Sequence, residues 1–140
     1  MCLLFFETLL LHRKRGAYAI HACVLMPDHF HILLTPSETC SLERAVQLIK
    51  GGSAHAMGME CRLQFPVWQR GFSDHRIRDA ADLNNHVRYI DQNPVHKRLV
   101  VDASDYRWSS ATGLHIMDPF PQGLKPPEKA SFFGAAKAAP

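Results

Sequence analysis

Two histidines separated by one residue, His29 and His31, form the first pattern in the sequence that could carry chemistry. On a strand, residues two apart leave the same face about 7 Å apart at their Cα atoms, so both imidazoles can reach one ion. Apolar Phe30 and Ile32 alternate with them, which indicates a half-buried strand. The spacing therefore permits a metal site, while two solvated or hydrogen-bonded imidazoles would give the same pattern.

Tyr89 and Asn93 form the second pattern, because residues four apart are neighbours on a helix. At about 100° per residue they share one stripe with His86, turned away from the apolar face of the same helix. A phenolic nucleophile and an oxygen ligand could thus face an ion held by the histidine strand. A surface tyrosine beside a helix-terminal asparagine is the open alternative.

A tyrosine nucleophile needs help at neutral pH, because its reference pKa is about 10. The groups nearest in sequence that could act as a base or supply positive charge are Arg88, His86 and the run His96-Lys97-Arg98. Each of them could equally be a solvated surface charge. The formal net charge of +3 suits a nucleic-acid partner without requiring one. The basic residues that we expect to contact DNA are Lys50, Arg70, Arg76, Arg88, Lys97 and Arg98.

The elements that must position these residues follow from periodicity and turn signals. We expect a helix over 3–14, a β-hairpin over 18–34 that turns at Pro27-Asp28, and a helix from Ser41 that Gly51-Gly52 ends or weakens. Residues 60–78 predict a loop with one short strand, and Asp79 predicts the start of a helix that Asn93-Pro94 closes. Residues 95–113 form a last structured piece.

The bulk properties bound the class of protein. A length of 140 residues with 46% hydrophobic content suits one domain, which we place at 1–116, followed by a proline-rich extended tail at 117–140 that ends in disorder. The four cysteines form no C-x-x-C pair, which favours reduced thiols. The apolar N-terminal run is interrupted by Glu7 and too short to span a membrane, so we expect a cytoplasmic protein.

Four segments together resemble a known family: MPDHFHILLTP at 26–36, VWQRGFSDHRIRD at 67–79, YIDQNPVHKRLV at 89–100 and DYRWSSA at 105–111. They resemble the IS200-like single-tyrosine (Y1, HUH) transposases, and among these the REP-associated tyrosine transposases. The resemblance covers roughly residues 17–127 and has its motifs in the family's order. It implies an α+β, ferredoxin-like domain with a central antiparallel sheet flanked by helices.

The resemblance also implies roles for individual residues. His29 and His31 match the histidines of the HUH motif, Tyr89 matches the nucleophile, and Asn93 matches the polar residue that completes the metal site. The implied activity is cleavage and rejoining of single-stranded DNA through a 5′-phosphotyrosine, with Mg²⁺ or Mn²⁺ as cofactor. The implied partner is single-stranded DNA with a hairpin near the cleavage site, bound by a monomer or homodimer without a membrane.

One departure from the family pattern affects the expected sheet. Relatives commonly begin with a further segment that ends in a strand of the central sheet, so we expect this chain to lack an N-terminal strand and to leave a sheet edge uncovered. A catalytically silent nucleic-acid-binding remnant or recruited regulator is therefore one alternative. A hydrolase or redox metalloprotein that uses His29 and His31 for another ion, with a structural Tyr89, is a second.

Overall fold

A computed structural model describes residues 1–63, 66–115, 117–120 and 131–137. The elements in chain order are α1 (Cys2–Lys14), β1 (Tyr18–Leu25), β2 (His29–Pro36), α2 (Leu42–Cys61), β3 (Ser73–Arg76), α3 (Ala80–His96), two short 3₁₀ turns (Ala103–Asp105 and Ser110–Thr112) and β4 (Ser131–Lys137). The strands form one antiparallel sheet in the order β1-β2-β4-β3. This confirms the expected α+β fold. In the described part of the chain, no helix is long and apolar enough to cross a bilayer.

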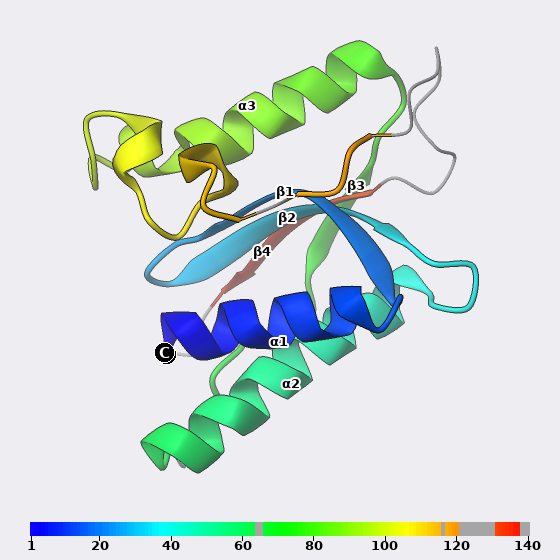
Figure 1. The fold of residues 1–140 in the computed structure, drawn as a ribbon, viewed down its shortest axis with the longest axis vertical. Coiled ribbons are helices and arrows are strands. Elements are labelled where there is room, and N and C mark those ends of the chain that lie inside the picture. Colours follow the sequence, from blue (N-terminus) through cyan, green and yellow to red (C-terminus); the bar gives the residue numbers. More distant parts are fainter. Residues whose placement is uncertain (64–65, 116, 121–130, 138–140) are drawn as a thin grey trace.

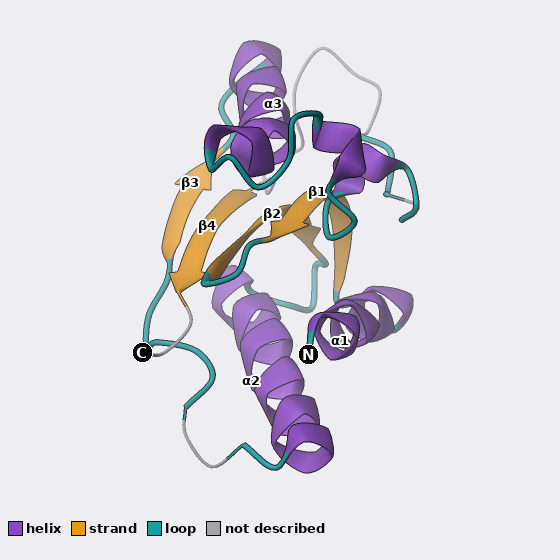
Figure 2. Ribbon diagram, turned by 90° about the vertical axis from the view of Figure 1, so that its left-hand side faces the viewer, coloured by secondary structure: helices purple, strands orange, loops and turns teal. Residues whose placement is uncertain are grey.

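The sheet lies between two helical layers. Helices α1 and α2 cover one face, and α3 crosses the other (Figures 1 and 2). The expected hairpin is confirmed, with β1 and β2 pairing from Tyr18 opposite Pro36 to Leu25 opposite Phe30 and one irregularity between Ile20 and Ala22. Because β2 is flanked by strands on both sides, its side chains are held more firmly than those of an edge strand would be.

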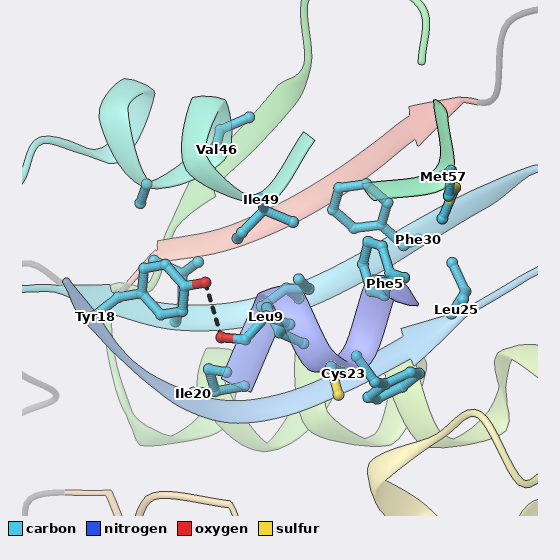
Figure 3. Close-up of a cluster of buried hydrophobic side chains, with 14 residues drawn as sticks. Phe5, Leu9, Tyr18, Ile20, Cys23, Leu25, Phe30, Val46, Ile49 and Met57 are labelled. Atoms are coloured by element: carbon cyan, nitrogen blue, oxygen red, sulfur yellow. Dashed lines mark hydrogen bonds between the residues drawn. The ribbon is translucent and has the colours of Figure 1, made fainter. Parts of the chain in front are cut away.

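The main hydrophobic core fills the space between the sheet and the pair α1 and α2 (Figure 3). Phe5 and Leu9 of α1 meet Phe30 of β2, with the Phe5 and Phe30 ring centroids 4.9 Å apart. The Tyr18 hydroxyl donates a hydrogen bond of 3.0 Å to the Leu9 carbonyl oxygen, so the one polar atom of that buried ring is satisfied. This core packs against one face of β2, and α3 covers the other face.

Helix α2 continues through Gly51-Gly52 and ends only at Cys61, so neither glycine terminates it. The reason at Gly52 is close packing against α1: a Cβ there would lie 2.7 Å from the Thr8 Cγ2 atom and 3.3 Å from the His12 Nε2 atom. A Cβ at Gly51 would meet nothing within 4 Å. The N-terminal cap expected at Ser41 is confirmed, because its side chain accepts a 3.1 Å hydrogen bond from the Arg44 backbone N–H.

Helix α3 begins after Asp79 as expected but runs past Asn93-Pro94 to His96, so our expectation that this pair closes the helix was wrong. Pro94 is fully buried in the last turns. Its missing N–H costs one backbone hydrogen bond, and the turn continues because the Lys97 N–H bonds to the Asn93 carbonyl at 3.0 Å and the Leu99 N–H to the Pro94 carbonyl at 2.9 Å. The consequence is that Asn93 lies within the helix and not at its end.

Strand β4 corrects two further expectations. Residues 131–137, which we placed in a tail ending in disorder, form a strand between β2 and β3, antiparallel to both. The second edge of β2 is therefore covered rather than open. We did not predict this strand because a proline-rich stretch precedes it. The Ser131-Phe132-Phe133 sequence nevertheless has the aromatic content that strands favour. Most of that proline-rich stretch belongs to residues 121–130, all of which lie outside the described residues. The domain boundary at 116 remains a prediction.

Candidate active site

His29 and His31 leave β2 on the face that α3 covers. Their ring centroids are 4.9 Å apart and their planes make an angle of 81°. His31 is buried, and His29 is partly open to solvent at the start of the strand. The alternation along β2 sends Phe30 to the opposite face, into the core with α1. The structure thus brings the two histidines together as the strand spacing predicted.

Tyr89 and Asn93 approach this pair from α3. The Tyr89 ring stands edge-on to the His31 ring with 5.2 Å between centroids, while 45% of Tyr89 is exposed. Asn93 lies one turn later and is only 4% exposed. Its Oδ1 atom accepts no hydrogen bond from any described residue. A buried amide oxygen without a donor is costly, unless a cation takes the donor's place.

The three tyrosines of the chain differ sharply in what their hydroxyl groups can do. The Tyr18 hydroxyl is bound to the Leu9 carbonyl oxygen, and the Tyr106 hydroxyl donates a 2.9 Å hydrogen bond to the Leu25 carbonyl oxygen. Burial raises the pKa of both phenols. Tyr89 is the most exposed of the three, and its ring lies against that of His31. Among the tyrosines, Tyr89 is therefore the only candidate nucleophile.

Electrostatics favour a neutral imidazole at His31. Burial, followed by the nearby charges of His29 and Lys97, lowers the pKa of His31 to about 4. At neutral pH this ring consequently keeps a lone pair that can be offered to a cation.

Asp28, which the sequence predicts only as part of a turn, lies beside His29 in the structure. Its Oδ1 atom lies 2.6 Å from the His29 Nδ1 atom, and this hydrogen bond lowers the pKa of the Asp28 carboxyl. If Nδ1–H is donated to the carboxylate, the Nε2 atom of His29 is the one that could coordinate an ion, in the manner of carboxylate-histidine pairs in metalloproteins. The direct adjacency of aspartate and histidine was the signal available in the sequence.

The donor set of two imidazoles and one amide oxygen fits a divalent cation. Imidazole and oxygen ligands suit several first-row ions, and the oxygen ligand with water suits Mg²⁺ or Mn²⁺. The Oδ1 atom of Asn93, buried without a hydrogen-bond donor among the described residues, is the structural observation in favour of that fit.

The basic residues expected to contact DNA fall into two groups. Arg76, Arg88, Lys97 and Arg98 are exposed on β3, on α3 and just after α3. Lys97 lines a hollow with Asp28 and His29, beside the candidate ion site. Lys50 and Arg70 lie elsewhere, because the Lys50 Nζ atom donates to the carbonyl oxygens of Gln69 and Gly71 at 2.6 and 2.7 Å. These two bonds hold the loop against α2, and Arg70 is exposed on that loop.

Comparisons with known proteins agree on one family. A family model described as IS200-like transposase matches residues 8–93, which include both histidines, Tyr89 and Asn93. The REP-associated tyrosine transposase of Escherichia coli (strain K12) is 33% identical over 112 residues, covering 76% of this chain and 65% of the relative. A second such protein, from Haemophilus influenzae, is 34% identical over 100 residues, covering 64% of this chain and 56% of the relative. The chain thus spans less than two thirds of the length of these relatives.

A solved structure extends the agreement to the fold. A REP-associated tyrosine transposase bound to a REP hairpin matches with a TM-score of 0.66 and 27% sequence identity. The match covers 91% of this chain and 77% of that one.

Proposed function

The chain belongs to the family of IS200-like transposases, and from this premise we propose that it cleaves and rejoins single-stranded DNA with Tyr89 as the nucleophile. The observation that carries the proposal is the position of Tyr89: it is the exposed tyrosine, and its ring lies 5.2 Å from that of His31, with the unsatisfied Asn93 oxygen one turn further along α3. A nucleophile and an ion site are thereby presented to the same phosphate.

In the proposed reaction, the Tyr89 hydroxyl oxygen attacks the phosphorus of a phosphodiester and releases its proton to solvent, to which the side chain is open. The bond from phosphorus to the 3′ oxygen breaks, and that oxygen keeps the electron pair and takes up a proton. The products are a 5′-phosphotyrosine on Tyr89 and a free 3′-OH. Because the phosphodiester is conserved in the covalent link, a 3′-OH can attack it and rejoin the strand without ATP.

We assign the ion site of this reaction to His29, His31 and Asn93, with Asp28 orienting His29. A bound Mg²⁺ or Mn²⁺ would polarise a non-bridging oxygen of the scissile phosphate. The neutral state of His31 and the fixed ring of His29 prepare the chain for such an ion.

The placement of basic residues supports two DNA contacts. Arg88 immediately precedes Tyr89 on α3, and Lys97 and Arg98 follow the end of that helix, so we place the single strand along this side of α3. Lys50 and Arg70 belong to the α2 side, where we place the backbone of a hairpin stem. Arg76 is exposed on β3, at the edge of the sheet. The hairpin-bound relative motivates this partner.

A covalent-adduct assay tests the proposal. The full chain is incubated with Mg²⁺ or Mn²⁺ and a pool of hairpin oligonucleotides that have randomised single-stranded flanks and a label at either end. A 5′-phosphotyrosine predicts that the 3′ label is retained on the protein in a denaturing gel, while the 5′ label is released on a shorter strand with a free 3′-OH. The adduct should require the divalent ion.

Two tyrosine variants sharpen the assay. Tyr89→Phe should form no adduct yet still bind the hairpin. Tyr106→Phe, which removes a hydroxyl that donates a hydrogen bond to the Leu25 carbonyl oxygen, should still form the adduct. Adduct formation by Tyr89→Phe would refute the assigned nucleophile. Hairpin binding by the unaltered chain without any adduct would instead support the catalytically silent DNA-binding alternative.

A further inference from the structure

A second group of candidate ligands lies outside the site described above, where β3 leads into α3. His75 belongs to β3, and Asp82 and His86 belong to the first turns of α3. One donor atom from each of these residues lies within 4.8 Å of the others. Within the described residues, this is the one such cluster of three or more histidine, cysteine or carboxylate side chains.

The carboxylate of Asp82 lies between the two imidazoles. The His75 Nε2 atom is 2.8 Å from the Asp82 Oδ2 atom, and the His86 Nδ1 atom is 3.1 Å from the Asp82 Oδ1 atom. The two rings are nearly parallel, at 15°, with 4.6 Å between centroids. Since both rings reach the same carboxylate, their nitrogen-bearing edges point toward one place.

These separations are close to those of a tetrahedral ion site. Zinc binds imidazole nitrogen and carboxylate oxygen at about 2.0–2.2 Å, so two donors at a tetrahedral angle lie about 3.3–3.5 Å apart. The two observed nitrogen-to-oxygen distances of 2.8 and 3.1 Å fall only a few tenths of an ångström short. A small outward shift of the side chains would admit an ion, and His75 and His86 are open enough for this, with 38% and 20% of their side chains exposed.

The chemistry of the three groups also suits zinc. The hydrogen bond from His75 is the largest cause that lowers the pKa of Asp82 to about 2, so this side chain is a carboxylate at neutral pH. Two imidazoles and one carboxylate form a common three-ligand zinc set that leaves a fourth position for water. The His86 Nδ1 atom also lies 2.8 Å from the Asp82 backbone carbonyl oxygen, a contact that holds the ring beside the Asp82 carboxylate.

The cluster connects an edge strand to the helix that carries Tyr89. Strand β3 has only four residues and pairs with β4 alone, so it is weakly held within the sheet. His86 precedes Tyr89 by three residues on α3. We propose that His75, Asp82 and His86 bind a zinc ion that braces α3 against β3, separately from the ion site of His29 and His31.

Zinc binding by the full chain tests this proposal without any DNA or measurement of activity. In a His29→Ala/His31→Ala background, which removes the first site, we expect about one zinc ion per chain by elemental analysis after dialysis, and a higher melting temperature with Zn²⁺ than without. Addition of His75→Gln and His86→Gln to this background should abolish both the bound ion and the thermal shift. His55→Gln, at an exposed histidine of α2, is the matched control and should change neither.

A milder variant guards against a fold lost through four substitutions. His75→Gln alone alters an exposed edge-strand residue, and in the His29→Ala/His31→Ala background it should weaken zinc binding about tenfold or more. Absence of bound zinc in that background before any change to the cluster would overturn the proposal. So would unchanged affinity in the His75→Gln variant. Neither result bears on the role of Tyr89.

Discussion

Substitution of Gly52 by alanine is predicted to destabilise the protein, although alanine is the better helix former. The exchange gains about 1 kcal/mol in helix propensity. Against this, the new Cβ would lie 2.7 Å from the Thr8 Cγ2 atom, where something must move, and such overpacking costs about 1–3 kcal/mol. We therefore expect a net loss of about 1 kcal/mol, which corresponds to a fall in melting temperature of about 3–4 °C for a domain of this size.

Gly51 supplies the matched control, because a Cβ there meets nothing within 4 Å. Gly51→Ala should raise stability by up to about 1 kcal/mol in urea denaturation, so the two neighbouring substitutions should change it in opposite directions. Thr8→Ser removes the methyl group that Gly52→Ala would meet, and the double variant should recover most of the loss. Equal stability of Gly51→Ala and Gly52→Ala would refute the close approach of α1 and α2.

Three further predictions concern other parts of the molecule. Asp118→Asn removes the carboxylate that accepts two 2.7 Å hydrogen bonds from Arg13, so stability should fall by about 1 kcal/mol at pH 7. Although burial opposes it, these bonds lower the pKa of Asp118, so their contribution is present above the unfolded pKa and is lost as pH falls through the folded one. Urea denaturation should show the difference in stability between the variant and the unaltered chain shrinking as pH falls below about 3.9, the ordinary pKa of aspartate. A difference that stays constant at acid pH would contradict this account. Asp28→Asn should weaken Mn²⁺ binding by about tenfold in calorimetric titration, because a neutral amide oxygen orients His29 less strongly than a carboxylate. The melting temperature should not change, because the side chain is exposed and keeps its size; unchanged affinity would exclude the orienting role. Deletion of residues 121–140 removes β4 and should give dimers or aggregates in size-exclusion chromatography, since the facing edges of β2 and β3 become available to other chains, whereas a stable monomer would show that β4 is dispensable.

Local features of the fold were predictable from the sequence. The two-residue period of a strand places His29 and His31 on one face whatever the rest of the chain does, and the cap residues Ser41 and Asp79 mark helix starts through a bond to their own neighbours. The spacing of Tyr89 and Asn93 on one helix belongs to the same class of local information. The candidate site therefore depends on two local predictions, the shared strand face of His29 and His31 and the shared helix of Tyr89 and Asn93, together with a family resemblance.

Features that depend on distant parts of the chain were not predictable in this way. Pro94 is tolerated in α3 because it is buried against other elements, and Gly52 lies within α2 because α1 passes close to it. The pairing of β4 with β2 joins residues about a hundred positions apart, and the periodicity of either segment does not predict which strand it pairs with. His75 reaches Asp82 and His86 only because the chain turns between β3 and α3. No spacing rule for a single helix or strand predicts such a contact.

The position of β4 also has a consequence for the order in which the molecule can be completed during synthesis. About 95 residues separate the end of β2 from the start of β4, so at roughly 5–20 residues per second the strand with both histidines waits about 5–20 s for its second neighbour. During that interval α1, β1, β2 and α2 have emerged and can bury their shared core, while one side of β2 still lacks a backbone partner. The sheet that holds the candidate catalytic histidines is thus among the first parts of the chain to begin folding and the last to be finished.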